Sequence, residues 1–210
     1  MLSLLLSGLA AQAQVGPNYR WIDFSGQTAP TVASYPATLT SNDGSVTMTV
    51  SGNAPIGFAN AGNDGGPNPL AAPFVGAGNA RTGVVVSQER STATLTYQLG
   101  SQVVAQNFWI SDQRYDTWTD ISGDCMNAAG TGLEACDFRN LPGQYTGQTS
   151  GSGYCGTGLQ YYDNSAGVLT LYTSPNGGCI QSDSYYVHLP ANLRVLRVQV
   201  NHSGNTDFTI

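Results

Sequence analysis

The sequence predicts an all-β fold, a two-sheet antiparallel sandwich of jelly-roll type with about ten strands and long loops. Three observations support this prediction. Apolar residues alternate with polar ones in several short segments, as in strands that bury one face. Gly, Asn, Asp and Pro separate these segments, as they do at turns. No window of helical length carries a 3.6-residue period free of Gly, Pro or β-branched runs.

Strict alternation is clearest in residues 46–50, 93–99 and 196–200. We expect further strands at residues 19–24, 83–87, 103–111, 159–163, 168–173, 185–189 and 206–210. Two long segments do not fit the strand pattern. Residues 53–80 are rich in Gly, Asn, Pro and Ala, and residues 112–152 carry two cysteines, so both are expected to be loops.

The first residues predict export. Residues 1–13 combine a short leucine-rich run with Ala11-Gln12-Ala13, a small-x-small cleavage pattern, although no basic residue precedes the run. We therefore expect a signal peptide over 1–13, its start incomplete, and a single β-sandwich domain over 14–210. No later stretch approaches the ~20 apolar residues of a membrane-spanning helix. The expected location is secreted or at a bacterial cell surface, without membrane insertion.

The charge composition excludes one class of partner. Only 10% of residues are charged, the cations are seven Arg with no Lys, and the sequence pI is about 4.5. Nucleic-acid-binding proteins neutralise phosphates with clustered Lys and Arg, which this chain lacks. We expect no nucleic-acid partner.

Four cysteines agree with an exported protein: Cys125, Cys136, Cys155 and Cys179. An even set at these long spacings favours disulfides over a zinc site, because no C-x-x-C pair is present. Three pairings are open. Sequential closure, Cys125 to Cys136 and Cys155 to Cys179, needs only short loops.

Two segments carry a family resemblance. TATLTYQLGSQVVAQNFWISDQRYDTW and the final VLRVQVNHSGNTDFTI resemble hairpins of exported bacterial β-sandwich domains, the type often followed by a C-terminal sorting signal. Trp109 stands where that hairpin has its second Phe. The resemblance covers about 45 residues and implies a surface location and a β-sandwich fold.

Aspartates recur every four residues at Asp112, Asp116, Asp120 and Asp124. Calcium takes six to eight oxygen ligands, and clustered Asp in an extracellular loop supplies them. The spacing suggests a structural Ca²⁺ site. The alternative is a solvated loop, in which Asp acts only in turns.

Aromatic residues gather in the second half of the chain. They are Trp109, Tyr115, Trp118, Tyr154, Tyr161, Tyr162, Tyr172, Tyr185 and Tyr186. Flat rings stack on apolar sugar faces, and aromatics also anchor protein interfaces. As candidate ligand-binding residues we take Tyr115, Trp118, Tyr154, Tyr161 and Tyr162. Adjacent residues of a strand face opposite ways, so one of Tyr161 and Tyr162 is expected to point into the core.

Enzymatic constellations are poorly represented. The only glutamates, Glu89 and Glu134, lie outside predicted strands, and no G-x-S-x-G elbow accompanies the two histidines. The sequence favours a non-enzymatic surface module for binding or adhesion, with glycans or a surface protein as partner and no catalytic residues. The alternatives are a secreted glycoside hydrolase of jelly-roll type and a structural envelope or matrix component.

Overall fold

The computed structural model describes the chain in eleven segments: residues 22–24, 26–60, 82–86, 91–104, 107–114, 117–138, 148–149, 160–165, 167–173, 182–202 and 208–209. Within them the chain forms fourteen strands and one short 3-10 helix, η1 (Val32–Ser34). Every strand pairing is antiparallel. The all-β, antiparallel part of the prediction is confirmed.

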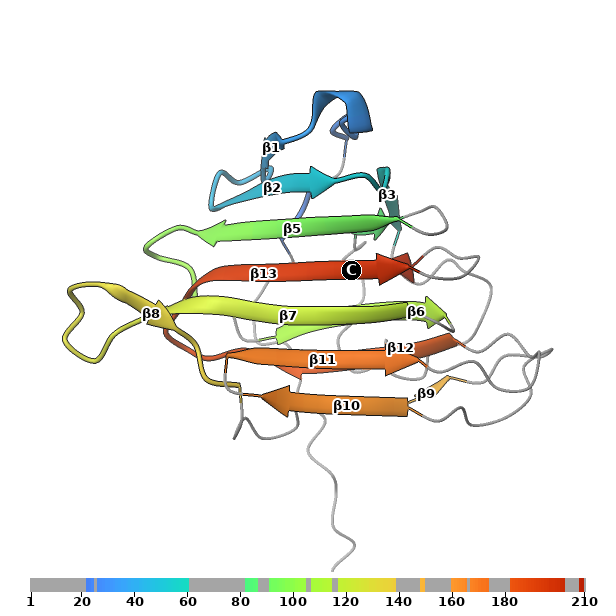
Figure 1. Ribbon diagram of the computed structural model, residues 1–210. Helices are drawn as coiled ribbons and strands as arrows, with labels where there is room; N and C mark the ends of the chain where they lie inside the picture. The colour runs from blue at the N-terminus through green and yellow to red at the C-terminus, as the bar shows by residue number, and fades with distance from the viewer. Residues whose placement is uncertain are drawn as a thin grey trace, which may run out of the picture.

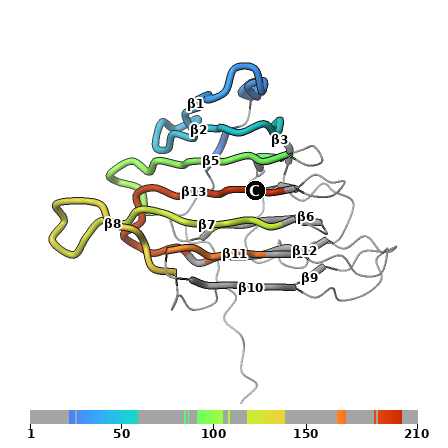
Figure 2. Tube along the Cα trace, viewed as in Figure 1, coloured from blue at the N-terminus to red at the C-terminus, as the bar shows by residue number. Residues whose placement is uncertain are grey.

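The larger sheet has eight strands (Figure 1). In spatial order they are β1 (Ala37–Thr40), β2 (Val46–Gly52), β5 (Thr92–Leu99), β13 (Leu193–His202), β7 (Thr117–Met126), β11 (Val168–Thr173) and β10 (Gln160–Ser165), with β8 (Leu133–Ala135) paired to β7. The central pair, β13 and β7, joins residues 68 to 85 positions apart in the chain. Figure 2 shows the coloured parts of these strands running side by side.

The second sheet has six strands and lies behind the first in the view of Figure 1. Its order is β3 (Ile56–Asn60), β4 (Thr82–Val86), β14 (Phe208–Thr209), β6 (Asn107–Arg114), β12 (Ser182–His188) and β9 (Gln148–Thr149).

No helix long and apolar enough to cross a membrane occurs among the described residues.

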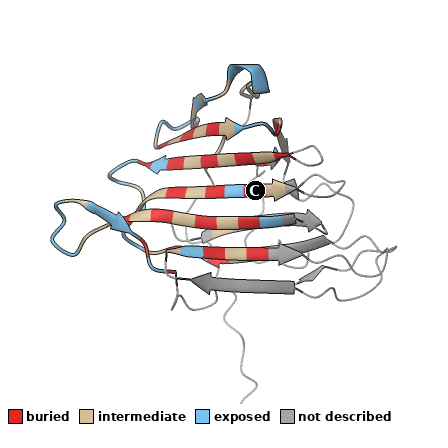
Figure 3. Ribbon diagram, viewed as in Figure 1, coloured by how far each residue is buried: buried red, intermediate tan, exposed pale blue. Residues whose placement is uncertain are grey.

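Buried and partly exposed residues alternate along the strands of the larger sheet (Figure 3). One cluster of buried side chains draws on both sheets. From the larger sheet it includes Val46, Met48, Val50, Ala93, Leu95, Tyr97, Leu99, Ile121, Cys125, Leu169, Leu171, Leu193, Leu196, Val198 and Val200. From the smaller sheet it includes Ile56, Val84, Val86 and Val187. One face of the larger sheet is therefore a core face, and the opposite face is its outer face.

The structure corrects the loop prediction for residues 112–152. Residues up to Arg114 continue β6, and β7 occupies Thr117–Met126 at the centre of the larger sheet. Asp and Gly are depleted in strands, so the Asp-rich, Gly-containing sequence of β7 indicated turns. Pairing with β13 on one side and β11 on the other outweighs that local preference.

Smaller differences concern strand limits. Residues 22–24 are not a strand, the predicted strand at 103–111 begins at Asn107, and β3 lies inside the predicted loop 53–80. The rest of that loop, residues 61–81, lies outside the described residues, as does the predicted signal segment 1–13.

Candidate ligand-binding face

The outer face of the eight-stranded sheet is polar. Its positions follow from alternation with the buried residues and from the cross-strand register. Partly or well exposed residues at these positions include Thr47, Thr49, Thr94, Thr96, Trp118, Asp120, Ser122, Asp124, Val168, Thr170, Arg197, Gln199 and Asn201. Hydroxyl and amide groups predominate, so this face offers many hydrogen-bonding groups and few charges.

An aromatic row crosses three neighbouring strands of this face. Trp118 of β7 is 37% exposed. The register pairs Trp118 with Tyr172 of β11, and Tyr172 with Tyr161 of β10. Residues paired directly across strands share a face, and adjacent strands lie about 4.8 Å apart. We call Trp118, Tyr172 and Tyr161 the aromatic row.

A polar row runs beside the aromatic row, two residues along each strand. It consists of Asp120 of β7, Thr170 of β11 and Asp163 of β10, which the register pairs in that order. Thr170 Oγ1 donates a hydrogen bond to Asp120 Oδ1 at 2.6 Å. On its other side, Asp120 is paired with the exposed Gln199 of β13. The polar row thus places the positions of two aspartates and a threonine beside those of the aromatic row.

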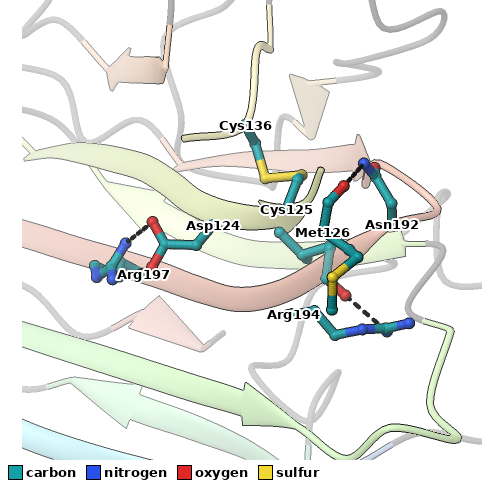
Figure 4. The surroundings of a disulfide bond; sticks show 8 residues. Asp124, Cys125, Met126, Cys136, Asn192, Arg194 and Arg197 are labelled. Carbon is teal, nitrogen blue, oxygen red and sulfur yellow. Dashed lines mark hydrogen bonds and ion pairs between the residues drawn. A yellow bond between two sulfur atoms is a disulfide. The ribbon is translucent and has the colours of Figure 1, made fainter. Parts of the chain in front are cut away.

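An ion pair lies farther along the same face (Figure 4). Arg197 of β13 donates from both terminal nitrogens to both carboxylate oxygens of Asp124 of β7, with the Nη1–Oδ1 distance at 3.0 Å. The hydrogen bonds from Arg197, together with its charge, lower the pKa of Asp124. The same pairing raises the pKa of Arg197. This two-pronged geometry occupies the carboxylate-binding edge of the guanidinium.

This ion pair predicts a pH dependence of stability. Because the folded-state pKa of Asp124 lies below its ordinary value of 3.8, the pair stabilises the fold above that pH and is lost as pH falls through the lowered pKa. The pair is partly exposed, so its contribution is about 0.5–1 kcal/mol. We compare the free energy of unfolding in urea at pH 6 and pH 2.5. Acidification should lower it by about 0.5–1 kcal/mol less in Asp124→Asn than in the wild type. An equal loss in both proteins would contradict this role.

The Cys125–Cys136 disulfide closes the short loop after β7 (Figure 4), as sequential pairing predicts. Both cysteines are buried, and their Cα atoms are 5.1 Å apart. Asn192 braces the same strand end, because Asn192 Nδ2 donates to the Met126 carbonyl at 2.7 Å and the Met126 amide donates to the Asn192 carbonyl at 2.8 Å. Cys155 and Cys179 lie outside the described residues.

The aspartates suggested as calcium ligands are divided between the two sheets. Asp112 lies in β6 of the smaller sheet, Asp120 and Asp124 lie in β7 of the larger one, and Asp116 is outside the described residues. Asp120 and Asp124 are four residues apart on one strand, about 13 Å at the rise of an extended chain. Since Ca²⁺–O bonds are about 2.3–2.6 Å, these two carboxylates do not share one ion. The described residues contain no group of three or more His, Cys, Asp or Glu able to hold a metal.

The structure brings together two of the five candidate ligand-binding residues. Trp118 and Tyr161 lie in the aromatic row, whereas Tyr162 is paired with the buried Leu171 and so occupies a core-face position. Tyr115 and Tyr154 lie outside the described residues. The prediction omitted Tyr172, although its alternation with Leu171 in LTLYT places it opposite the core.

Comparison with known proteins identifies no family for this chain. No family model matches it, and no curated protein matches it. Among solved structures it is similar to the enzymatically active domain of tailspike protein 4 of bacteriophage CBA120, with 11% sequence identity and a TM-score of 0.33. The match covers 80% of this chain but 18% of the tailspike chain, so this chain spans less than a fifth of that protein.

Proposed function

We propose that the chain is a secreted or cell-surface module that binds glycans, without catalysis, through the outer face of its eight-stranded sheet. The observation that carries the proposal is the aromatic row, in which the register aligns Trp118, Tyr172 and Tyr161 across three adjacent strands. A linear row of rings suits an extended ligand that is itself a chain of flat rings. Sugar units have an apolar face that stacks on aromatic rings.

The polar groups beside the row support the same ligand class. Carboxylate, hydroxyl and amide groups at Asp120, Thr170 and Gln199 are suited to the hydroxyls at the edge of a sugar ring. Two-sheet sandwiches of jelly-roll type are a common architecture for lectin domains. The single cluster formed by buried residues of both sheets supports such an architecture for this chain. The Cys125–Cys136 disulfide supports the secreted location, since disulfides persist in oxidising compartments.

Affinity electrophoresis through gels containing neutral polysaccharides tests the proposal. We expect the wild type to be retarded by at least one of a β-glucan, a xylan, a mannan and a dextran. Trp118→Ala should weaken that binding at least about tenfold, or 1.4 kcal/mol, as expected for a partly exposed aromatic anchor. Trp109→Ala, on β6 of the other sheet, is the matched control and should bind as the wild type does.

Three results would contradict the proposal. Retardation by none of the polysaccharides would favour a structural envelope component instead. Equal losses in the Trp118 and Trp109 variants, with both proteins folded, would place the binding elsewhere. Release of reducing ends from the retarding polysaccharide would show hydrolysis and favour the glycoside hydrolase.

A further inference from the structure

The charged residues on the outer face of the larger sheet are few and unbalanced. At the regularly alternating outer-face positions of the described strands there are three aspartates, Asp120, Asp124 and Asp163, and one cation, Arg197, while Arg194 at the β13 bulge donates to the Val103 carbonyl. The chain contains no Lys, and its formal net charge is −6. The face that we propose as the binding surface therefore carries a negative charge within a negative protein.

The guanidinium of Arg197 is already occupied. Arg197 donates from both terminal nitrogens to Asp124. This contact occupies the planar edge of the guanidinium, which would otherwise bind a carboxylate or sulfate of a ligand. Arg197 also lies four residues from Asn201, the β13 residue paired with Trp118, or about 13 Å along the strand. The aromatic row consequently has no available cation beside it among the described residues.

Asp120 and Asp163 occupy strand positions next to those of the aromatic row. Asp120 is two residues from Trp118 on β7, and Asp163 is two residues from Tyr161 on β10. Two residues of a strand span about 6.6 Å. A sugar ring stacked on Trp118 therefore lies within about one Debye length of the Asp120 carboxylate at physiological salt, where repulsion between like charges is only partly screened.

We infer that this face selects uncharged polysaccharides and excludes acidic ones, with Asp120 and Asp163 as the residues that determine this specificity. The inference rests on the proposed glycan-binding function. Carboxylates accept hydrogen bonds from the hydroxyls of a neutral sugar, and they repel the carboxylate or sulfate of a uronic or sulfated sugar. The same two residues therefore favour one class of ligand and disfavour the other.

Pairs of polysaccharides that share a backbone and differ in charge test this inference. Suitable pairs are hydroxyethyl and carboxymethyl cellulose, arabinoxylan and glucuronoxylan, and dextran and dextran sulfate. We expect the wild type to bind the neutral member of at least one pair and to bind its acidic partner at least tenfold more weakly. Raising the salt concentration to 0.5 M should reduce that difference, because the repulsion is screened.

Removing the two charges provides the second arm of the test. Asp120→Asn/Asp163→Asn keeps a side-chain oxygen at both positions. It should strengthen binding of the acidic member and bring it to within about threefold of the neutral one, while binding of the neutral member weakens because an amide oxygen accepts a weaker hydrogen bond than a carboxylate does. Asp112→Asn/Asp183→Asn removes two carboxylates from β6 and β12 of the other sheet and should leave the discrimination unchanged.

The outcomes separate the inference from the proposal on which it rests. Binding of an acidic member as strongly as its neutral partner would overturn the inference and leave glycan binding in place. Unchanged discrimination in the Asp120/Asp163 double variant would overturn the role of these residues. Binding to neither member of any pair would contradict glycan binding itself, and the inference with it.

Discussion

Gly123→Ala should destabilise the fold by about 3 kcal/mol, measured as a lower urea midpoint with an unchanged slope. Gly123 is a buried residue of β7 opposite Leu196 of β13. A Cβ atom at this position would lie 2.4 Å from the carbonyl oxygen of Val195 and 2.7 Å from Cδ1 of Leu193. The closer of these atoms belongs to the backbone, so a change of rotamer cannot relieve the clash.

The close approach has an identifiable cause. The register between β13 and β7 shifts between Leu193 and Val195, as in a β-bulge that adds one residue to β13. The bulge residue, Arg194, donates to the carbonyl oxygen of Val103 at 3.0 Å. At the bulge the Val195 carbonyl approaches Gly123 more closely than a side chain allows.

A second strand glycine supplies the control. A Cβ at Gly57 of β3 would have no heavy atom within 4 Å. Gly57→Ala should therefore be neutral or stabilise the protein by about 0.5 kcal/mol, because Ala restricts the unfolded chain more than Gly does. Equal free energies of unfolding for Gly123→Ala and Gly57→Ala would contradict the close approach of β13 to β7 at the bulge.

Cys125→Ala/Cys136→Ala should lower the free energy of unfolding by about 3 kcal/mol. The bridge spans 11 residues, and loop-closure entropy in the unfolded chain accounts for roughly 2.7 kcal/mol of that loss. Both cysteines are buried, so replacing them also removes packed atoms. Urea unfolding measures the total loss, and limited proteolysis between residues 127 and 135 reports whether the loop that the bridge closes has loosened.

Leu133→Ala is the matched variant for the disulfide. Leu133 lies in the same closed loop but is 53% exposed, so its truncation should change stability by less than about 0.5 kcal/mol. A double cysteine variant as stable as Leu133→Ala would show that the bridge does not hold the end of β7 against the core.

Strands with strict alternation were predictable from sequence. β2, β5 and β13 each alternate apolar residues with Thr, Gln or Arg, and the apolar residues are the buried ones. The predicted limits of β11 agree with the structure. In these segments the local β-preference and the burial pattern indicate the same conformation, so tertiary contacts need not override either.

The candidate site was predictable only in part. Trp118 and Tyr161 were identified as aromatics, but their alignment through Tyr172 depends on which strands pair and in what register. The long-range pairing of Arg197 with Asp124 depends in the same way on contact between β13 and β7. Register between strands far apart in the chain is a tertiary property, and a single sequence does not specify it.

Tryptophan fluorescence during titration with neutral oligosaccharides tests the central claim most directly. The chain has three tryptophans, Trp21, Trp109 and Trp118. With cellohexaose, xylohexaose, mannohexaose and isomaltohexaose as probes, we expect at least one to shift the emission of the wild type to the blue, because stacking removes water from Trp118. Trp118→Phe should abolish that shift, and Trp109→Phe should retain it. A shift that survives Trp118→Phe and disappears in Trp109→Phe would place the ligand on the other sheet and contradict the account.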